Sequence, residues 1–214
     1  MATTPLSADR LVILALEAGV QSLLADAALY SRMLASYPAE ELTRMRARFV
    51  GRRPTVRPAF ARADDLWPVW AVTLGDEQVE QELLGNLLSI DPALGAHGSQ
   101  EIGALERQSV GIYIHCEHPE ETRAHHQLAK AILRGSVPWL LQQGVVAVSY
   151  GGGRDLRPNE SYLPESIFVR MQVWELTLPS VGYEVLPTPR SQVYAHLTGI
   201  TVSGHAGHVA PEGE

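Results

Sequence analysis

The stretch Ser109-Val-Gly-Ile-Tyr-Ile-His-Cys-Glu-His-Pro-Glu-Glu-Thr-Arg-Ala124 decides which fold this sequence predicts. Its first half, from Val110 to Ile114, is made of β-branched and aromatic residues around one glycine, which favours a central strand of a sheet. Pro119 then suits the first position of a helix, and the two glutamates after it favour the positive end of the helix dipole. A strand that leads directly into a helix is therefore predicted.

The residues after this junction predict the rest of a compact core. Gly135 is expected to end the helix, and a short second helix is expected over residues 137–142. Val145–Tyr150 and Ile167–Leu178 are typical of strands, because β-branched and aromatic residues are frequent in both. The whole of Gln108–Pro179 is thus predicted to form a β-α-β-β core.

The preceding part of the chain predicts helices and a hairpin. Ser7 to about Ala35 has apolar residues at helical spacing and predicts one long helix, and Ala39–Arg48 predicts a short one. Residues 51–58 contain a glycine and two prolines, which indicates a loop or arm. Trp67–Leu84 has Gly-Asp between two strand-like runs and predicts a β-hairpin, followed by an exposed loop over residues 89–99.

Together these segments predict an α+β fold in which a mixed or antiparallel sheet is packed by the long N-terminal helix and the central helix. We expect a single domain over residues 1–180, with an arginine-rich arm over 44–62, and a C-terminal extension over 181–214. Val193–Val202 in this extension is strand-like. A strand without a neighbour commonly adds to an exposed sheet edge of another subunit, so we expect the extension to contact neighbouring subunits.

Composition bounds the class of protein. Apolar residues make up 45% of the 214 residues and charged residues 19%, which is ordinary for a soluble globular protein. No run of about 18 uncharged apolar residues exists, so no membrane span is expected. The start has no signal-peptide pattern, which favours synthesis in a cytoplasm. Cys116 is the single cysteine, so a disulfide within the chain is excluded.

The charge is unevenly distributed along the chain. The net charge is -7, yet residues 44–62 contain seven arginines and no acid, so the remainder carries -7 - 7 = -14. The segment has only Phe49 and Phe60 as interleaved aromatics, and two prolines keep it from being a groove-reading helix, so a protein-facing role is favoured over contact with DNA phosphates or simple solvation. The residues that we predict at a subunit or partner interface are Arg44, Arg46, Arg48, Arg52, Arg53, Arg57, Glu80, Glu82, Val193 and Tyr194.

The candidate catalytic groups lack partners in the sequence. His115, His118 and His125 are nitrogen ligands near one strand-to-helix junction and offer an alternative, a metal-dependent hydrolase, although their spacing fits no known ligand pattern. Ser149 lies in a pattern one residue away from a nucleophile elbow, but no helix pattern follows it. Cys116 has no catalytic base in its strand that could face it. We therefore expect no enzyme activity, no metal and no cofactor.

Several short patterns in the chain resemble phage neck proteins of the tail-terminator type. They are Trp70-Ala-Val-Thr-Leu-Gly75, Ser109 to Ala124, Ser149-Tyr-Gly-Gly-Gly-Arg-Asp-Leu-Arg-Pro158 and Ser161-Tyr-Leu-Pro-Glu-Ser-Ile-Phe-Val-Arg-Met171. The resemblance covers roughly residues 65 to 180 and rests on these patterns, not on a catalytic signature.

The resemblance implies a structural virion protein of the head-tail junction with an α+β fold. Such proteins form a hexameric ring that caps the tail tube and faces the head-side connector or adaptor protein, while genomic DNA passes through the lumen without specific binding. It also implies a location in the virion tail or neck. The N-terminal helix and the residues after Pro179 exceed the minimal form of that fold, which leaves a head-completion or collar protein of the same neck as an alternative.

Overall fold

The computed structural model describes residues 7–62, 65–81, 87–90, 97–156, 163–164 and 166–189. The chain divides into two compact units, one made of Met1–Val79 with Glu106–Pro179 and one made of Glu80–Leu105 with Ser180–Glu214. The division of the chain near residue 180 into a domain and an extension stays a prediction.

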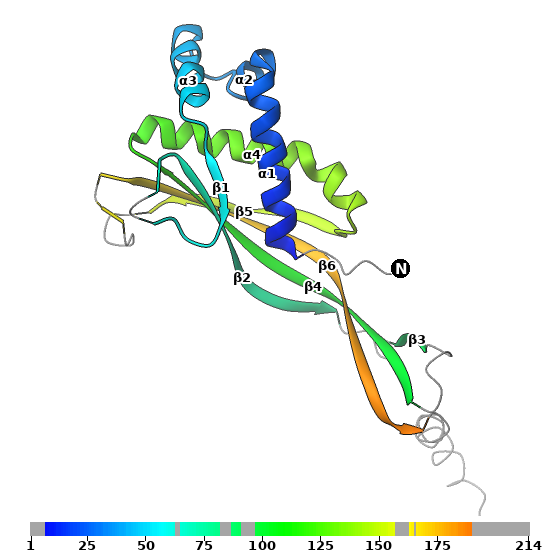
Figure 1. Ribbon diagram of the computed structural model, residues 1–214. Helices are drawn as coiled ribbons and strands as arrows, with labels where there is room; N and C mark the ends of the chain where they lie inside the picture. Colours follow the sequence, from blue (N-terminus) through cyan, green and yellow to red (C-terminus); the bar gives the residue numbers. More distant parts are fainter. Residues whose placement is uncertain are drawn as a thin grey trace, which may run out of the picture. The chain divides into compact units, whose positions relative to one another are not determined.

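The fold is α+β, as the sequence predicts (Figure 1). The sheet has the strand order β1-β2-β4-β6-β5, with β3 paired to β4 beside this path. β1 is parallel to β2, whereas β5 is antiparallel to β6 and β3 to β4, so the sheet is mixed. The elements are α1 (Ala8–Ala25), α2 (Ala27–Met33), α3 (Ala39–Gly51), β1 (Thr55–Pro58), β2 (Val69–Gln81), β3 (Leu87–Ile90), β4 (His97–Cys116), α4 (Pro119–Gln142), β5 (Ala147–Asp155) and β6 (Phe168–Pro189).

The predicted β-α-β-β core is present as β4, α4, β5 and β6. α4 lies across one face of the sheet with α1 beside it, as Figure 1 shows. Apolar side chains of α1 such as Leu16 and of α4 such as Leu128 are buried in one cluster with sheet residues that include Trp70, Ile112 and Trp174. Burial of apolar surface between these layers is the main term that stabilises the first unit.

The other face of the same strands holds a smaller apolar cluster. It consists of Ala61, Val69, Ala71, Leu163 and Val169, with Trp67, Tyr113, Leu156 and Ile167 packed against it. Because side chains alternate along a strand, neighbours such as Val69 and Trp70 are buried on opposite faces. Both faces of the central strands are thus covered in the first unit.

The expected long helix over Ser7–Ala35 is wrong, because Asp26 divides it. The Asp26 carboxylate accepts hydrogen bonds from the backbone N–H of Ala28 at 2.8 Å and of Leu29 at 3.0 Å. This N-cap starts α2 in a new direction, at 116° to α1. Among the described residues no single helix is long and apolar enough to cross a membrane, and α1 with α2 meets that test only as a bent pair.

Two strand predictions are corrected as well. The hairpin expected over Trp67–Leu84 is wrong for its described part, since β2 continues through Gly75-Asp76 without a turn. Gly75 instead lies against β4, where a Cβ would stand 3.3 Å from the carbonyl oxygen of Ser109. The arm expected over residues 51–58 contains β1, in which Thr55 is opposite Val69 of β2.

The remaining differences concern the lengths of elements. α4 continues through Gly135 and Pro138 as one helix, where two were expected. In the second unit, the expected loop over residues 89–99 overlaps β3 and the start of β4, which pair with Ile90 opposite Gln100.

Gly19 tests the packing of α1 on α4. Gly19→Ala is expected to lower the free energy of unfolding by about 1–3 kcal/mol, because a Cβ there would lie 2.3 Å from Cγ2 of Ile132. Gly135→Ala is the matched control in α4, where a Cβ meets no heavy atom within 4 Å, and it should raise stability by about 0.5–1 kcal/mol. Urea unfolding monitored by circular dichroism measures both. An unchanged midpoint for Gly19→Ala would contradict this close approach.

Candidate partner interface

α3 carries three arginines of the predicted interface and is held in place by one aromatic side chain. Phe49 is the buried residue of this helix. Its ring lies 5.3 Å from the ring of Tyr30 in α2 and 5.5 Å from that of His125 in α4, both in tilted arrangements. Arg44 and Arg48 lie on the exposed side of the same helix. Anchoring by Phe49 therefore presents these two guanidinium groups to solvent.

A pocket of about 340 Å³ lies between α2, α3 and the start of α4. Its wall carries both signs of charge, with Glu41, Arg44 and Arg48 from α3 and Glu120 and Glu121 from α4. In the part of the chain that the structure describes, no ion pair joins these arginines to a carboxylate. The lining residues are Tyr30, Glu41, Arg44, Met45, Arg48, Glu120, Glu121, Ala124 and His125.

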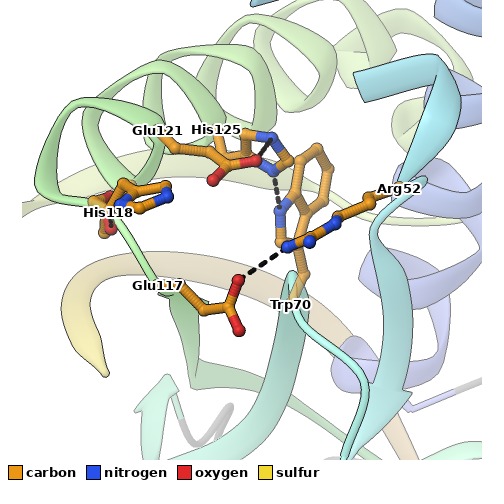
Figure 2. A network of polar contacts seen from close by, with 7 residues as sticks. Arg52, Trp70, Glu117, His118, Glu121 and His125 are labelled. Carbon is orange, nitrogen blue, oxygen red and sulfur yellow. Dashed lines mark hydrogen bonds and ion pairs between the residues drawn. The ribbon is translucent and has the colours of Figure 1, made fainter. Parts of the chain in front are cut away.

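Other arginines of the segment bind their own chain. Arg52 Nη1 lies 2.6 Å from Oε2 of Glu117, which directly follows β4, and both side chains are exposed (Figure 2). Arg57 of β1 pairs with Asp65, and both side chains are mostly buried. Arg46 donates from Nη2 to the carbonyl oxygen of Leu24 at 3.4 Å.

The predicted interface arginines thus divide into two groups. Arg46, Arg52 and Arg57 hold α3 and β1 on neighbouring segments of the first unit. Arg44, Arg48 and Arg53 are exposed, and none of them has an ion-pair partner among the described residues. The second group is the one available to a partner.

The other predicted interface residues fall outside the first unit. Glu80 lies in β2, within the second unit. Glu82, Val193 and Tyr194 lie outside the described residues. The sequence did not indicate that Glu117 and Asp65 are partners of the arginines. Asp65 is among the first acids after the segment, which is a weak signal that could have suggested its pairing with Arg57.

Behind the pocket, a buried polar contact joins the sheet to α4. The indole Nε1–H of Trp70 donates to His125 Nδ1 at 3.1 Å (Figure 2). His125 Nε2 then carries the ring proton and lies 4.0 Å from Glu121 Oε1. Burial lowers the pKa of His125 to about 3, so the imidazole is neutral at ordinary pH.

The structure does not assemble the three histidines of the hydrolase alternative. His115 lies on the opposite face of the sheet from His125, with its ring 5.8 Å from that of Trp67. His118 is exposed at the N-cap of α4. Within the described ranges, no three His, Cys, Asp or Glu side chains are grouped so that they could hold a metal ion. Burial also raises the pKa of the Cys116 thiol, which disfavours the nucleophilic thiolate.

Comparisons with known proteins add little to this geometry. No protein-family model and no curated protein matches the chain. Among solved structures, a chain of the "Virion of native gene transfer agent (GTA) particle" matches with 12% sequence identity and a TM-score of 0.29, covering 71% of this chain and 92% of that chain. A likeness at this TM-score supports no conclusion about fold or function.

Stability should fall as the pH drops below about 6.5. Burial lowers the pKa of His125 to about 3 and of His126 to about 4, so the folded state keeps both rings neutral while the unfolded chain takes up protons. The stability that comes from the neutral rings is fully present above the pKa of a histidine in the unfolded chain. It is lost as the pH falls towards the pKa in the folded chain, by about 1.4 kcal/mol per pH unit for each histidine.

His125→Gln isolates the contribution of this one ring. Urea unfolding at pH 7.0, 6.0 and 5.0 should show a shallower pH slope for His125→Gln than for the natural chain. His118→Gln, at the exposed N-cap, is the matched control and should keep the natural slope. Equal slopes for all three proteins would contradict the assignment.

Proposed function

We propose that this chain is a structural virion protein that forms an oligomeric ring, a hexamer, at the head-tail junction of a tailed phage. In this role it caps the tail tube and joins it to the head-side connector or adaptor protein. The observation that carries the proposal is the placement of the segments that resemble phage neck proteins. Residues 70–75 lie in β2, 109–124 in β4 and the start of α4, 149–155 in β5 and 168–171 in β6, which are neighbouring elements of one sheet and its helix.

The uneven distribution of charge along the chain supports contact between copies. Arg44, Arg48 and Arg53 are exposed without a described ion-pair partner, whereas the chain outside residues 44–62 has an acidic excess of -7 - 7 = -14. Copies arranged head to tail can place such a basic segment against an acidic surface of the next copy. The acidic excess also suits a lumen that repels DNA phosphates, so that the genome passes without specific binding.

A structural role without catalysis, metal or cofactor is part of this proposal. The rival hydrolase needs His115, His118 and His125 at one ion, and two of these side chains lie on opposite faces of the sheet. A head-completion or collar protein of the same neck remains the alternative. The two are distinguished by which neighbour the ring binds, the tail tube protein or the head-side connector.

Electron microscopy of the purified chain tests the ring. Negative-stain images with the tail tube protein of the same phage should show rings, and tubes capped at one end. Rings that bind only the head-side connector would favour the head-completion alternative. The proposal is wrong if the chain stays monomeric at high concentration and forms no ring with either neighbour.

The exposed arginines of α3 should be needed for assembly and not for folding. Arg44→Glu with Arg48→Glu is expected to abolish rings while the free energy of unfolding in urea stays within about 0.5 kcal/mol of the natural value, as is usual for surface changes. Arg10→Glu with Arg134→Glu changes the net charge equally at exposed positions outside the segment and should leave the rings intact. Loss of rings in both double variants would mean that net charge alone decides assembly.

A further inference from the structure

The outer edge of β5 is an open strand edge. β5 ends the strand order of the sheet, and its inner side pairs with β6, with Ala147 opposite Thr177 and Tyr150 opposite Trp174. On its outer side, none of the strands that the structure describes pairs with it. Backbone N–H and C=O groups on such an edge can form a ladder with a further strand.

The two edges of the sheet differ in their protection against such pairing. β1, at the opposite edge, has four residues, follows Pro54, contains Arg57 and ends at Pro58. Short length, charge and proline are the features by which natural proteins block an edge. β5 has neither a charge nor a proline from Ala147 to Gly153. β5 therefore lacks the features that protect β1.

The regular part of this open edge is short. The register of β5 on β6 shifts between Tyr150 and Gly152, which is a β-bulge, and Gly152 has a φ of 122° that side-chain-bearing residues rarely adopt. The first register runs from Ala147 to Tyr150, and pairing resumes after the bulge over Gly152–Asp155, where Arg154 and Asp155 carry charge. Within the first register, Val148 and Tyr150 pack against the large core cluster, and Ser149 is exposed on the other face.

The chain itself contains a segment that fits this edge. Residues 190–214 lie outside the described part, and within them Val193-Tyr-Ala-His-Leu-Thr-Gly-Ile-Thr-Val202 is rich in β-branched and aromatic residues, without charge or proline. Such a sequence favours a strand and requires a neighbouring strand for its backbone groups. It follows β6, which pairs with β5 only from Arg170 to Thr177.

We infer that residues 193–202 of one copy add as a strand to the Ala147–Tyr150 edge of β5 in a neighbouring copy. This inference rests on the proposed ring, and it identifies one contact between neighbouring copies in that ring. If each copy donates one segment and receives one, the contact is head to tail and every β5 edge in a closed ring is filled.

Disulfide trapping tests the pairing, because the natural chain has one cysteine, Cys116, and it is buried. Ser149→Cys is combined in one chain with a single cysteine placed in turn at each position from Val193 to Val202. Successive side chains of a strand point to opposite faces, so the yield of covalent dimers and higher oligomers should peak at the position opposite Ser149, with weaker trapping two residues away and none between. Non-reducing gel electrophoresis after mild oxidation measures the cross-linked fraction.

Thr55→Cys, exposed on the β1 edge, replaces Ser149→Cys in the matched control series and should give no cross-linked oligomers. Rings in the electron microscope without cross-linking at Ser149 would overturn this inference and leave the proposed function intact. Cross-links confined to single chains, a cross-linked fraction without the two-residue period, or equal trapping at Thr55 would overturn it too. Alternate cross-links without closed rings would support the strand pairing and count against the ring.

Discussion

The apolar cluster that packs α4 on the sheet encloses one polar contact on which its order depends, the hydrogen bond from the Trp70 indole to the His125 imidazole. It joins β2 to the helix within the apolar cluster, where an unpaired N–H would be unfavourable by a few kcal/mol. The pairing also requires a neutral imidazole that accepts through Nδ1. Burial that lowers the pKa of His125 therefore preserves the only protonation state that suits the contact.

The position of α3 follows from the same region of the core. Phe49 packs on the ring of His125 from one side and on Tyr30 from the other, so α3 is held to α4 through the residue that also binds the sheet. The exposed arginines of α3 take their direction from Phe49 and from Leu42 and Met45, which pack against the same cluster. A basic surface on a rigid helix costs less ordering entropy on binding than one on a mobile loop.

The core could be predicted from the sequence because its signals are local. A run of β-branched residues followed closely by a proline and two acids indicates a strand that leads into a helix, whatever the rest of the chain does. This pattern marks the junction of β4 and α4. The errors arose where a distant contact or a cap prevailed. The Asp26 carboxylate accepts a hydrogen bond from the N–H of Ala28 and so divides the expected long helix. Gly75 allows close packing of β2 against Ser109 and does not form a turn. The partners of Arg52 and Arg57 likewise depend on which segments the fold brings together.

The difference between the two sheet edges bears on the direction of assembly. Prolines and charged side chains on an edge strand prevent a further strand from pairing with it. Natural proteins use these features where such pairing would be harmful. The residues around β1 carry these features together with exposed Arg53, so this edge suits contacts through side chains. β5 lacks them over the four residues before its bulge. β5 therefore suits backbone pairing with a further strand and β1 suits side-chain contacts, so the two edge strands differ in the kind of contact that they can make.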